Sequence, residues 1–190
     1  MSETPSPPQQ ARVFFALWPE PGVQSQLHGH GRELQRRLGG KLTREESVHL
    51  TLVFLGDVRL DRLELLHELA AAVDFEPFTL EVDSAGFWPH NKIAWLAPRS
   101  TPQPLLVLVE ALRGRLADAG FRVETRRYGA HITVVRKAQP RPFDPVVPIV
   151  EWPVKEFVLV RSVLDSEGSR YTAIGRWPAA GSTATATNSV

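Results

Sequence analysis

Val48-His-Leu-Thr-Leu-Val-Phe-Leu55 is an apolar, strand-forming run with a histidine and a threonine two residues apart, and Ala130-His-Ile-Thr-Val-Val-Arg136 repeats the arrangement. Side chains alternate between the two faces of a β-strand, so the histidine and the threonine of each run share one face. Their apolar neighbours are expected to point the other way, into a core: Leu50, Leu52, Ile132 and Val134. Each run therefore predicts a strand that presents one imidazole and one hydroxyl from a rigid apolar support.

Hydrophobic periodicity around these two runs predicts further strands and helices. Strands are expected at residues 12–18, 48–55, 78–83, 92–97, 130–136, 156–164 and 170–177. Helices are expected at residues 21–38, 60–73 and 103–119. Residues 86–91 are expected to form a connecting turn, and residues 165–169 a hairpin-type turn. This order predicts an α+β fold with mainly antiparallel sheets.

The chain also contains an approximate internal repeat. A strand, a helix and a His-x-Thr strand follow one another in the first half, and the same succession recurs in the second half. Two similar lobes that face each other would account for this repeat.

Composition limits the class of protein. With 190 residues, of which 43% are hydrophobic, the chain can bury the core of one domain or of two closely packed lobes. A net charge of only +1 argues against a coat for long nucleic acids, but a short RNA end held by a local basic patch is compatible with it. Cysteine is absent, which excludes disulfides and thiol chemistry and is compatible with a reducing cytoplasm. We find neither a membrane-spanning apolar stretch nor a secretory signal, so no membrane association is expected.

Both ends of the chain are poor in apolar residues. Residues 1–10 contain three prolines, and residues 179–190 are mostly small or hydroxylated. We therefore expect disordered tails at 1–10 and 179–190 around a single globular unit at 11–178.

Paired histidines suit chemistry at a phosphodiester. Because the ordinary pKa of histidine is about 6.5, one imidazole can accept a proton from water while the other protonates a leaving oxygen. The hydroxyls of Thr51 and Thr133 can donate to non-bridging phosphoryl oxygens, where negative charge builds up. No third ligand of suitable spacing accompanies His49 and His131, so a metal site is not expected. A glycine-rich phosphate loop is also absent.

The two motifs resemble the paired H-x-T-x signatures of the 2H phosphoesterase superfamily, and within it the bacterial RNA 2',3'-cyclic phosphodiesterases, also called the 2'-5' RNA ligase family. The resemblance rests on His49-Leu-Thr-Leu-Val-Phe-Leu-Gly56 and His131-Ile-Thr-Val134. It extends to Phe14-Phe-Ala-Leu17, Ser169-Arg-Tyr-Thr172 and Arg176-Trp177, and so to most of the expected globular unit.

The resemblance implies a bilobal α+β fold in which two similar lobes, each with an antiparallel sheet and helices, enclose an active-site cleft. It implies hydrolysis of RNA 2',3'-cyclic phosphate ends to 2'-phosphomonoesters without a metal or other cofactor. His49 would be the proton donor to the leaving 3'-oxygen and His131 the proton acceptor. The reverse reaction, 2'-5' ligation, uses the same groups. A cytoplasmic monomer that acts on RNA, with tRNA fragments as one candidate, is the corresponding expectation.

Two flanking positions depart from the family pattern, which often has proline where this chain has Ala130 and asparagine where it has Ser47. These departures bear more on substrate preference than on the chemistry, because the histidines and threonines are present.

Four further residues are candidates for binding the substrate. Arg136 occupies a place where the family often has arginine, although strict alternation would turn it away from His131. Arg127, beside Arg126, could hold an RNA phosphate, and Tyr171 or Phe14 could stack on a base. The five tryptophans are expected in the core or at lobe edges.

Two alternative functions are compatible with the same residues. One is a non-catalytic binder of RNA ends, and the other is a phosphodiesterase for small cyclic nucleotides. A binder would have no use for a titratable pair, so the retention of both histidines and both threonines favours an enzyme.

Overall fold

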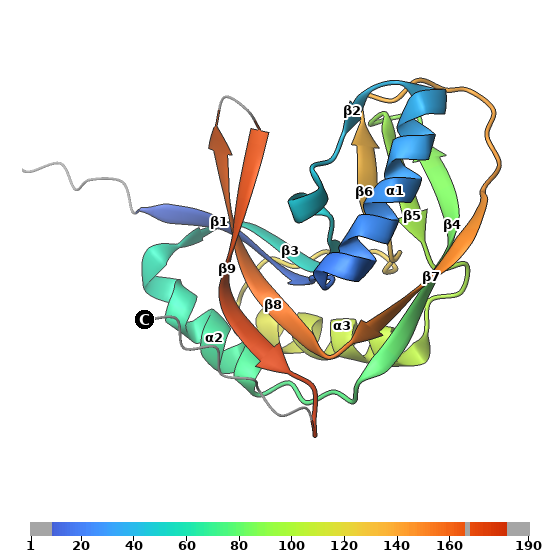
Figure 1. Cartoon of the computed structure of the whole chain (residues 1–190). Helices are drawn as coiled ribbons and strands as arrows, with labels where there is room; N and C mark the ends of the chain where they lie inside the picture. Colours follow the sequence, from blue (N-terminus) through green and yellow to red (C-terminus); the bar gives the residue numbers. More distant parts are fainter. Residues whose placement is uncertain (1–8, 166–167, 182–190) are drawn as a thin grey trace, which may run out of the picture.

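The computed structural model describes residues 9–165 and 168–181. Within these ranges the chain forms two antiparallel sheets with few helices, which confirms the α+β fold class (Figure 1). The expected tails lie largely outside the described residues. Gln10, however, begins the first strand, and Ala179 is 3% exposed with its N–H bonded to the carbonyl of Lys155. The folded unit therefore extends slightly beyond the expected 11–178.

The first sheet has four strands in the order β3-β1-β8-β9. These strands are β1 (Gln10–Leu17), β3 (Leu50–Arg59), β8 (Glu156–Asp165) and β9 (Gly168–Pro178). All neighbours pair in antiparallel fashion. β8 and β9 continue to Asp165 and Gly168, so the expected hairpin turn is shorter than residues 165–169, and residues 166–167 lie outside the described ranges.

The second sheet has five strands in the order β2-β6-β5-β4-β7, again all antiparallel. They are β2 (Lys41–Leu42), β4 (Phe78–Trp88), β5 (Ile93–Ala97), β6 (Ile132–Arg136) and β7 (Val146–Val154). A single residue, Lys155, separates β7 from β8, so the chain passes directly from one sheet to the other.

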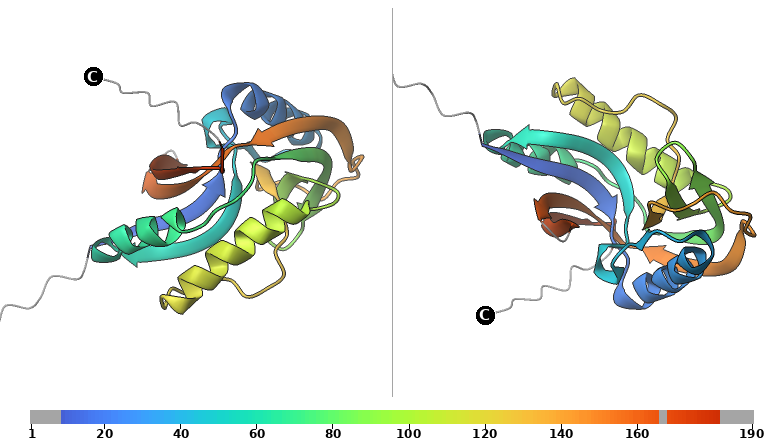
Figure 2. Two further views of the ribbon diagram at one scale, coloured as in Figure 1. Left: turned by 90° about the horizontal axis from the view of Figure 1, so that it is seen from below. Right: turned by 90° about the horizontal axis from the view of Figure 1, so that it is seen from above.

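Two of the three helices in the described part of the chain pack against the lobe opposite to the one they follow in the sequence. The helices are α1 (Pro21–Leu38), α2 (Leu63–Ala71) and α3 (Gln103–Asp118), with short 3-10 turns at Glu45–Ser47 and Leu60–Arg62. α1 connects β1 to β2 and β3 but packs on β5, β6 and β7 of the second sheet, whereas α3 connects β5 to β6 but contacts β3 and α2. The two helices lie on opposite sides of the molecule (Figure 2). Each half of the chain thus contributes a helix to the other lobe, which fixes the two motif strands relative to each other.

The described helices include none that is both long and apolar enough to cross a membrane.

Two strands were missing from the sequence expectation. β7 contains Pro148 and Pro153, which cannot donate to a sheet ladder and so weaken the strand pattern of this segment. β7 is the edge strand of the second sheet, where one row of N–H groups has no partner strand, so proline is tolerated. β2 is only two residues long, too short for a periodic pattern.

The expected connecting turn at residues 86–91 is wrong in its first half. Gly86, Phe87 and Trp88 continue β4 and pair with β5. A Cβ atom on Gly86 would lie 2.0 Å from the indole of Trp95, so glycine is required here by close packing across the sheet and not by a turn. Trp88, the last residue of β4, is therefore part of the sheet and not of a turn.

The alternation expected within the motifs is confirmed. Leu50, Leu52, Ile132 and Val134 are at most 2% exposed, and all four belong to one apolar core that includes side chains of both sheets. The polar face of each motif strand is therefore left to point into the space between the lobes.

Candidate active site

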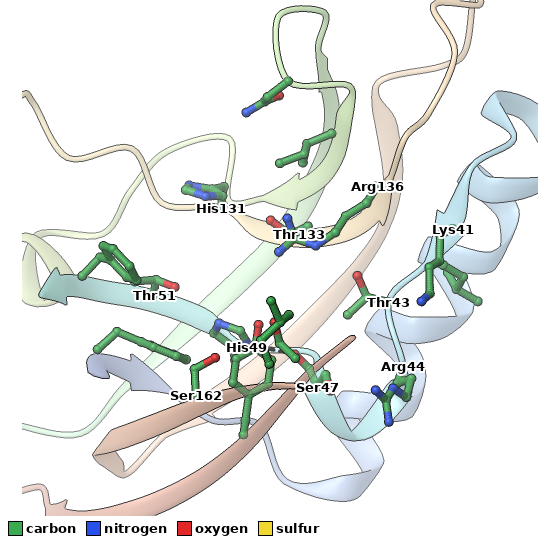
Figure 3. A pocket seen from close by; sticks show the side chains of 18 of the residues that line it. Lys41, Thr43, Arg44, Ser47, His49, Thr51, His131, Thr133, Arg136 and Ser162 are labelled. Atoms are coloured by element: carbon green, nitrogen blue, oxygen red, sulfur yellow. Dashed lines mark hydrogen bonds between the residues drawn. The ribbon is translucent and has the colours of Figure 1, made fainter. Parts of the chain in front are cut away.

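A cavity of about 850 Å³ takes its lining from strands of both sheets. His49 and Thr51 lie on one wall, and His131 and Thr133 lie on the opposite wall (Figure 3). Each histidine comes one residue before its strand, β3 or β6, and each threonine is the second residue of that strand. The structure thus brings together the four residues that the paired motifs singled out.

Both imidazoles are held in the same way. Nδ1 of His49 lies 2.7 Å from the carbonyl oxygen of Ser47, and Nδ1 of His131 lies 2.9 Å from that of Gly129. A carbonyl only accepts hydrogen bonds, so Nδ1 must carry the proton in the neutral ring. This leaves Nε2 of each histidine as the nitrogen that can exchange a proton with a ligand.

His49 lies in an aromatic box formed by Phe14, Trp18 and Tyr171. Its ring stacks on Phe14 and Trp18, with centroids 5.0 Å away in each case, and meets Tyr171 edge to face at 5.2 Å. The pKa of His49 is lowered to about 4, chiefly by burial in this box; the hydrogen bond to the Ser47 carbonyl opposes the shift, and the charges of Arg136 and His131 add to it.

His131 has a more open setting. Its ring contacts Trp88 edge to face with a centroid distance of 4.6 Å. Burial also lowers the pKa of His131, again against an opposing hydrogen bond to a carbonyl, that of Gly129. The lowered pKa values favour the neutral form of both imidazoles at pH 7 in the empty cavity.

A β-bulge turns Arg136 into the cavity. Trp95, Ala94 and Ile93 of β5 pair with Thr133, Val135 and Arg136, which leaves Val134 as the extra residue. Arg136 is three positions after Thr133, so regular alternation would put the two side chains on opposite faces. The extra residue shifts the alternation by one, and both side chains lie on the same face. Strict alternation had predicted the opposite direction, and the bulge is the reason why Arg136 lines the cavity.

The lining is strongly cationic. None of the described residues that form the lining carries a carboxylate. Five of them are lysines or arginines: Arg12, Lys41, Arg44, Arg136 and Lys137. The whole chain is nearly balanced, with 22 basic and 21 acidic residues. Positive charge is thus concentrated around the two histidines, which favours an anionic ligand.

The segment before His131 is tied to the other motif strand. The hydroxyl of Tyr128 donates to the carbonyl of Thr51 at 2.8 Å. Burial raises the pKa of Tyr128, so the phenol keeps the proton it donates. Arg113 of α3 lies over the Tyr128 ring and donates to the carbonyl of Arg126. These contacts set the distance between the two walls of the cavity.

The remaining expectations for the site have mixed outcomes. Tyr171 and Phe14 line the cavity, but Phe14 is only 4% exposed and packs on His49, so it has little surface to offer a base. Arg127 is exposed and does not line the cavity, so the structure gives no support to its expected role there.

Sequence reasoning missed several lining residues. Trp88 was assigned to a turn, and Phe54 was read only as part of the motif strand. Trp18, which follows β1 and stacks on His49, was also missed; alternation places it on the face of Phe14, so this periodicity was the available signal. Within the described part of the chain, no group of three or more histidine, aspartate or glutamate side chains is arranged to hold a metal ion.

Comparison with known proteins places these features in a family. Residues 23–165 match the family model of the 2'-5' RNA ligase superfamily. The RNA 2',3'-cyclic phosphodiesterase of Escherichia coli strain K12 is 33% identical over 169 residues, which cover 87% of this chain and 95% of that protein. The protein of the same name from Thermus thermophilus is 30% identical, covering 87% and 89% of the two chains.

Solved structures show the same architecture. The crystal structure of E. coli LigT in complex with 3'-AMP superimposes with a TM-score of 0.83 at 29% identity, covering 90% of this chain and 99% of that chain. The two-sheet, bilobal arrangement is therefore shared with a protein that binds a nucleotide.

Proposed function

The chain belongs to the 2'-5' RNA ligase superfamily, and on this premise we propose that it hydrolyses RNA 2',3'-cyclic phosphate ends to 2'-phosphomonoesters by two-histidine acid–base catalysis. The observation that carries the proposal is the pair of imidazoles on opposite walls of one cationic cavity, each with Nε2 left available for proton exchange. The names of the E. coli and T. thermophilus relatives support the choice of substrate.

The proposed step is an in-line displacement at phosphorus. His131 Nε2 takes a proton from water as the oxygen of this water forms a bond to phosphorus. The bond from phosphorus to the 3'-oxygen breaks on the opposite side, and protonated His49 Nε2 gives its proton to that oxygen. Thr51, Thr133 and Arg136 interact with the non-bridging oxygens, where negative charge accumulates. With the 5'-hydroxyl of a second RNA in place of water as the nucleophile, the same displacement would release the 3'-oxygen and join the two RNA ends through a 2'-5' bond.

The two histidines should give different pH profiles in the free and the liganded enzyme. Because the pKa of His49 is lowered to about 4, its protonated fraction in the empty cavity falls as the pH rises through about 4 and is small at neutrality. The negative charge of a bound phosphodiester opposes this shift and raises the pKa of His49. We expect kcat/KM, which reports the free enzyme, to decline with rising pH well before kcat, which reports the complex. Steady-state kinetics from pH 4 to 9 would show this, and coincident alkaline limbs would contradict it.

A direct test is incubation of the purified protein with adenosine 2',3'-cyclic phosphate and with a short RNA that ends in a 2',3'-cyclic phosphate, both in the presence of EDTA. We expect both to yield only the 2'-phosphomonoester, which phosphorus NMR distinguishes from the 3' isomer. A 3'-phosphate product would overturn the assignment of the bond that breaks. Tight binding of the RNA without turnover would instead establish the non-catalytic binder.

The same experiment separates the remaining alternative. Three cations of the lining lie in β2, two residues after β2 and directly after β6, where they would meet the phosphates of an RNA chain: Lys41, Arg44 and Lys137. A higher kcat/KM for the short RNA than for the mononucleotide is therefore expected. Turnover of the mononucleotide alone would favour a phosphodiesterase for small cyclic nucleotides.

A further inference from the structure

A second, smaller cavity lies beside His131 and is called the second hollow below. It is lined by residues within 84–88, 95–101 and 129–131, and its volume of about 370 Å³ is within the range of roughly 300–1,000 Å³ that is usual for small-molecule sites. Trp88 and His131 line both the second hollow and the larger cavity, and their rings meet edge to face with centroids 4.6 Å apart. Neither His49 nor Thr51 is among the described residues of its lining. The second hollow therefore adjoins the site only from the side of His131.

The second hollow opens on the same face of the second sheet as the second motif. Its walls come largely from β4 and β5, which are neighbours of each other and, through β5, of β6 (Figure 1). Trp95 pairs with Thr133, and directly paired residues project from the same face of a sheet. The indole of Trp95 lies over Gly86, its partner on β4, where a side chain would fill the space. Small residues leave the space beside the indoles open: Ala85, Ala97, Gly129 and Ala130.

The polar groups of the second hollow suit a ligand with little negative charge of its own. None of the described residues that line it carries a carboxylate, and Arg99 is the one lysine or arginine among them. The Arg99 side chain is 63% exposed, and its Nε lies 3.6 Å from the Asp83 carboxylate. Thr101 adds a hydroxyl. Two indole rings with one exposed cation fit a nucleoside that carries a single phosphate on its outer side better than a densely charged ligand.

The chemistry of the site assigns an occupant to this place. In an in-line displacement the nucleophile and the leaving oxygen lie on opposite sides of phosphorus, and His131 is on the side of the nucleophile in the proposed step. Water needs no cavity of this size. A 5'-hydroxyl does, because it arrives attached to a ribose and a base, and these must lie beyond His131 and away from His49.

We propose that the second hollow binds the 5'-terminal nucleoside of an RNA whose 5'-hydroxyl attacks the cyclic phosphate. The proposal rests on the function proposed above and adds the binding site of the second RNA. The 5'-oxygen forms a bond to phosphorus as its proton passes to His131, the bond from phosphorus to the 3'-oxygen breaks, and His49 gives its proton to that oxygen. The product is a 2'-5' diester with a free 3'-hydroxyl.

The test uses the same step in reverse, in which the 3'-hydroxyl attacks phosphorus and the alcohol on the His131 side departs. Adenylyl-(2'-5')-adenosine and the methyl ester of adenosine 2'-phosphate both give adenosine 2',3'-cyclic phosphate in this way, but only the first has a nucleoside to place in the second hollow. Contact with aromatic faces should favour the dinucleotide by about tenfold or more in kcat/KM for the wild type. Liquid chromatography of the cyclic phosphate and of the 2'-phosphate formed from it measures both reactions.

Blocking the second hollow should remove this preference alone. Thr101 lies in the loop between β5 and α3, so Thr101→Trp can fill the space without a change in either sheet. This variant should cleave the two diesters equally well and hydrolyse adenosine 2',3'-cyclic phosphate as the wild type does. Arg99→Trp, at an exposed position of the same loop, is the second blocking variant. Val107→Trp is the matched control, because Val107 is exposed on α3 and lines neither cavity.

The outcomes separate the second hollow from the proposed function. If the wild type leaves adenosine 2',3'-cyclic phosphate intact, the proposed function fails and the assignment of the second hollow falls with it. If the wild type hydrolyses this compound but cleaves neither diester, or cleaves both equally well, hydrolysis stands and the assignment is wrong. Retention of the preference in both blocking variants, with circular dichroism showing that they are folded, would also overturn it, as would loss of the preference in Val107→Trp.

Discussion

Replacement of His49 or His131 by alanine is expected to lower kcat for a 2',3'-cyclic nucleotide by roughly 10²- to 10⁴-fold, the range for loss of a general acid or base. The two imidazoles act in one step, so the double variant should be little worse than the more impaired single variant. KM should change less than kcat, because the cationic lining that attracts the phosphate is retained. Steady-state kinetics of the three variants would measure this.

His30→Ala is the matched control. His30 lies on α1 and does not line the cavity, so the same substitution should leave kcat unchanged. Wild-type turnover in either His49→Ala or His131→Ala would remove the basis of the proposed mechanism.

The leaving group distinguishes the donor from the acceptor. In a cyclic phosphate whose bridging 3'-oxygen is replaced by sulfur, the departing thiolate needs no proton. If His49 protonates the leaving atom, His49→Ala should recover much of its lost rate with this compound, while His131→Ala should not. Recovery in His131→Ala alone would reverse the two roles.

Features that depend only on neighbouring residues in the sequence, such as helix bounds and the buried face of a strand, were predicted correctly. The helix at residues 21–38 was predicted with the observed bounds of α1, because its apolar spacing is regular and Gly39 adopts a positive φ of 65° just beyond its end. The motif residues Leu50 and Ile132 were placed in the core correctly, because alternation in a strand needs no tertiary information. The resemblance of the paired motifs supplied the bilobal fold that local patterns could only suggest.

Other features depended on partners that no local pattern reveals. Each motif strand has a bulge, at Leu52 of β3 and at Val134 of β6, that is visible only in the pairing with β1 and β5. The directions of the Phe54 and Arg136 side chains could therefore not be predicted from the sequence. The exchange of α1 and α3 between lobes is likewise a tertiary arrangement. Gly86 was misread as a turn residue because the ring that requires it, Trp95, is on the neighbouring strand.

Loss of the threonine hydroxyls is the second large effect that we expect. Thr51→Val and Thr133→Val keep the shape and the preference for a strand but remove the only donor of the side chain. Removal of one preorganised donor to a developing negative charge costs about 10²- to 10³-fold in kcat, and we expect this loss in each variant. The threonines lie on separate walls of the cavity, so their losses should multiply in the double variant.

Serine is the informative replacement for these residues, since it keeps the hydroxyl and lacks only the methyl group. Thr51→Ser and Thr133→Ser should retain most of the wild-type kcat if the hydroxyl donates to the phosphoryl oxygens. A hydroxyl that bound the ground state and the transition state equally would raise KM on removal and leave kcat intact. The proposed role therefore requires that the valine variants lose kcat at nearly constant KM, and a change confined to KM would reduce both threonines to substrate binding.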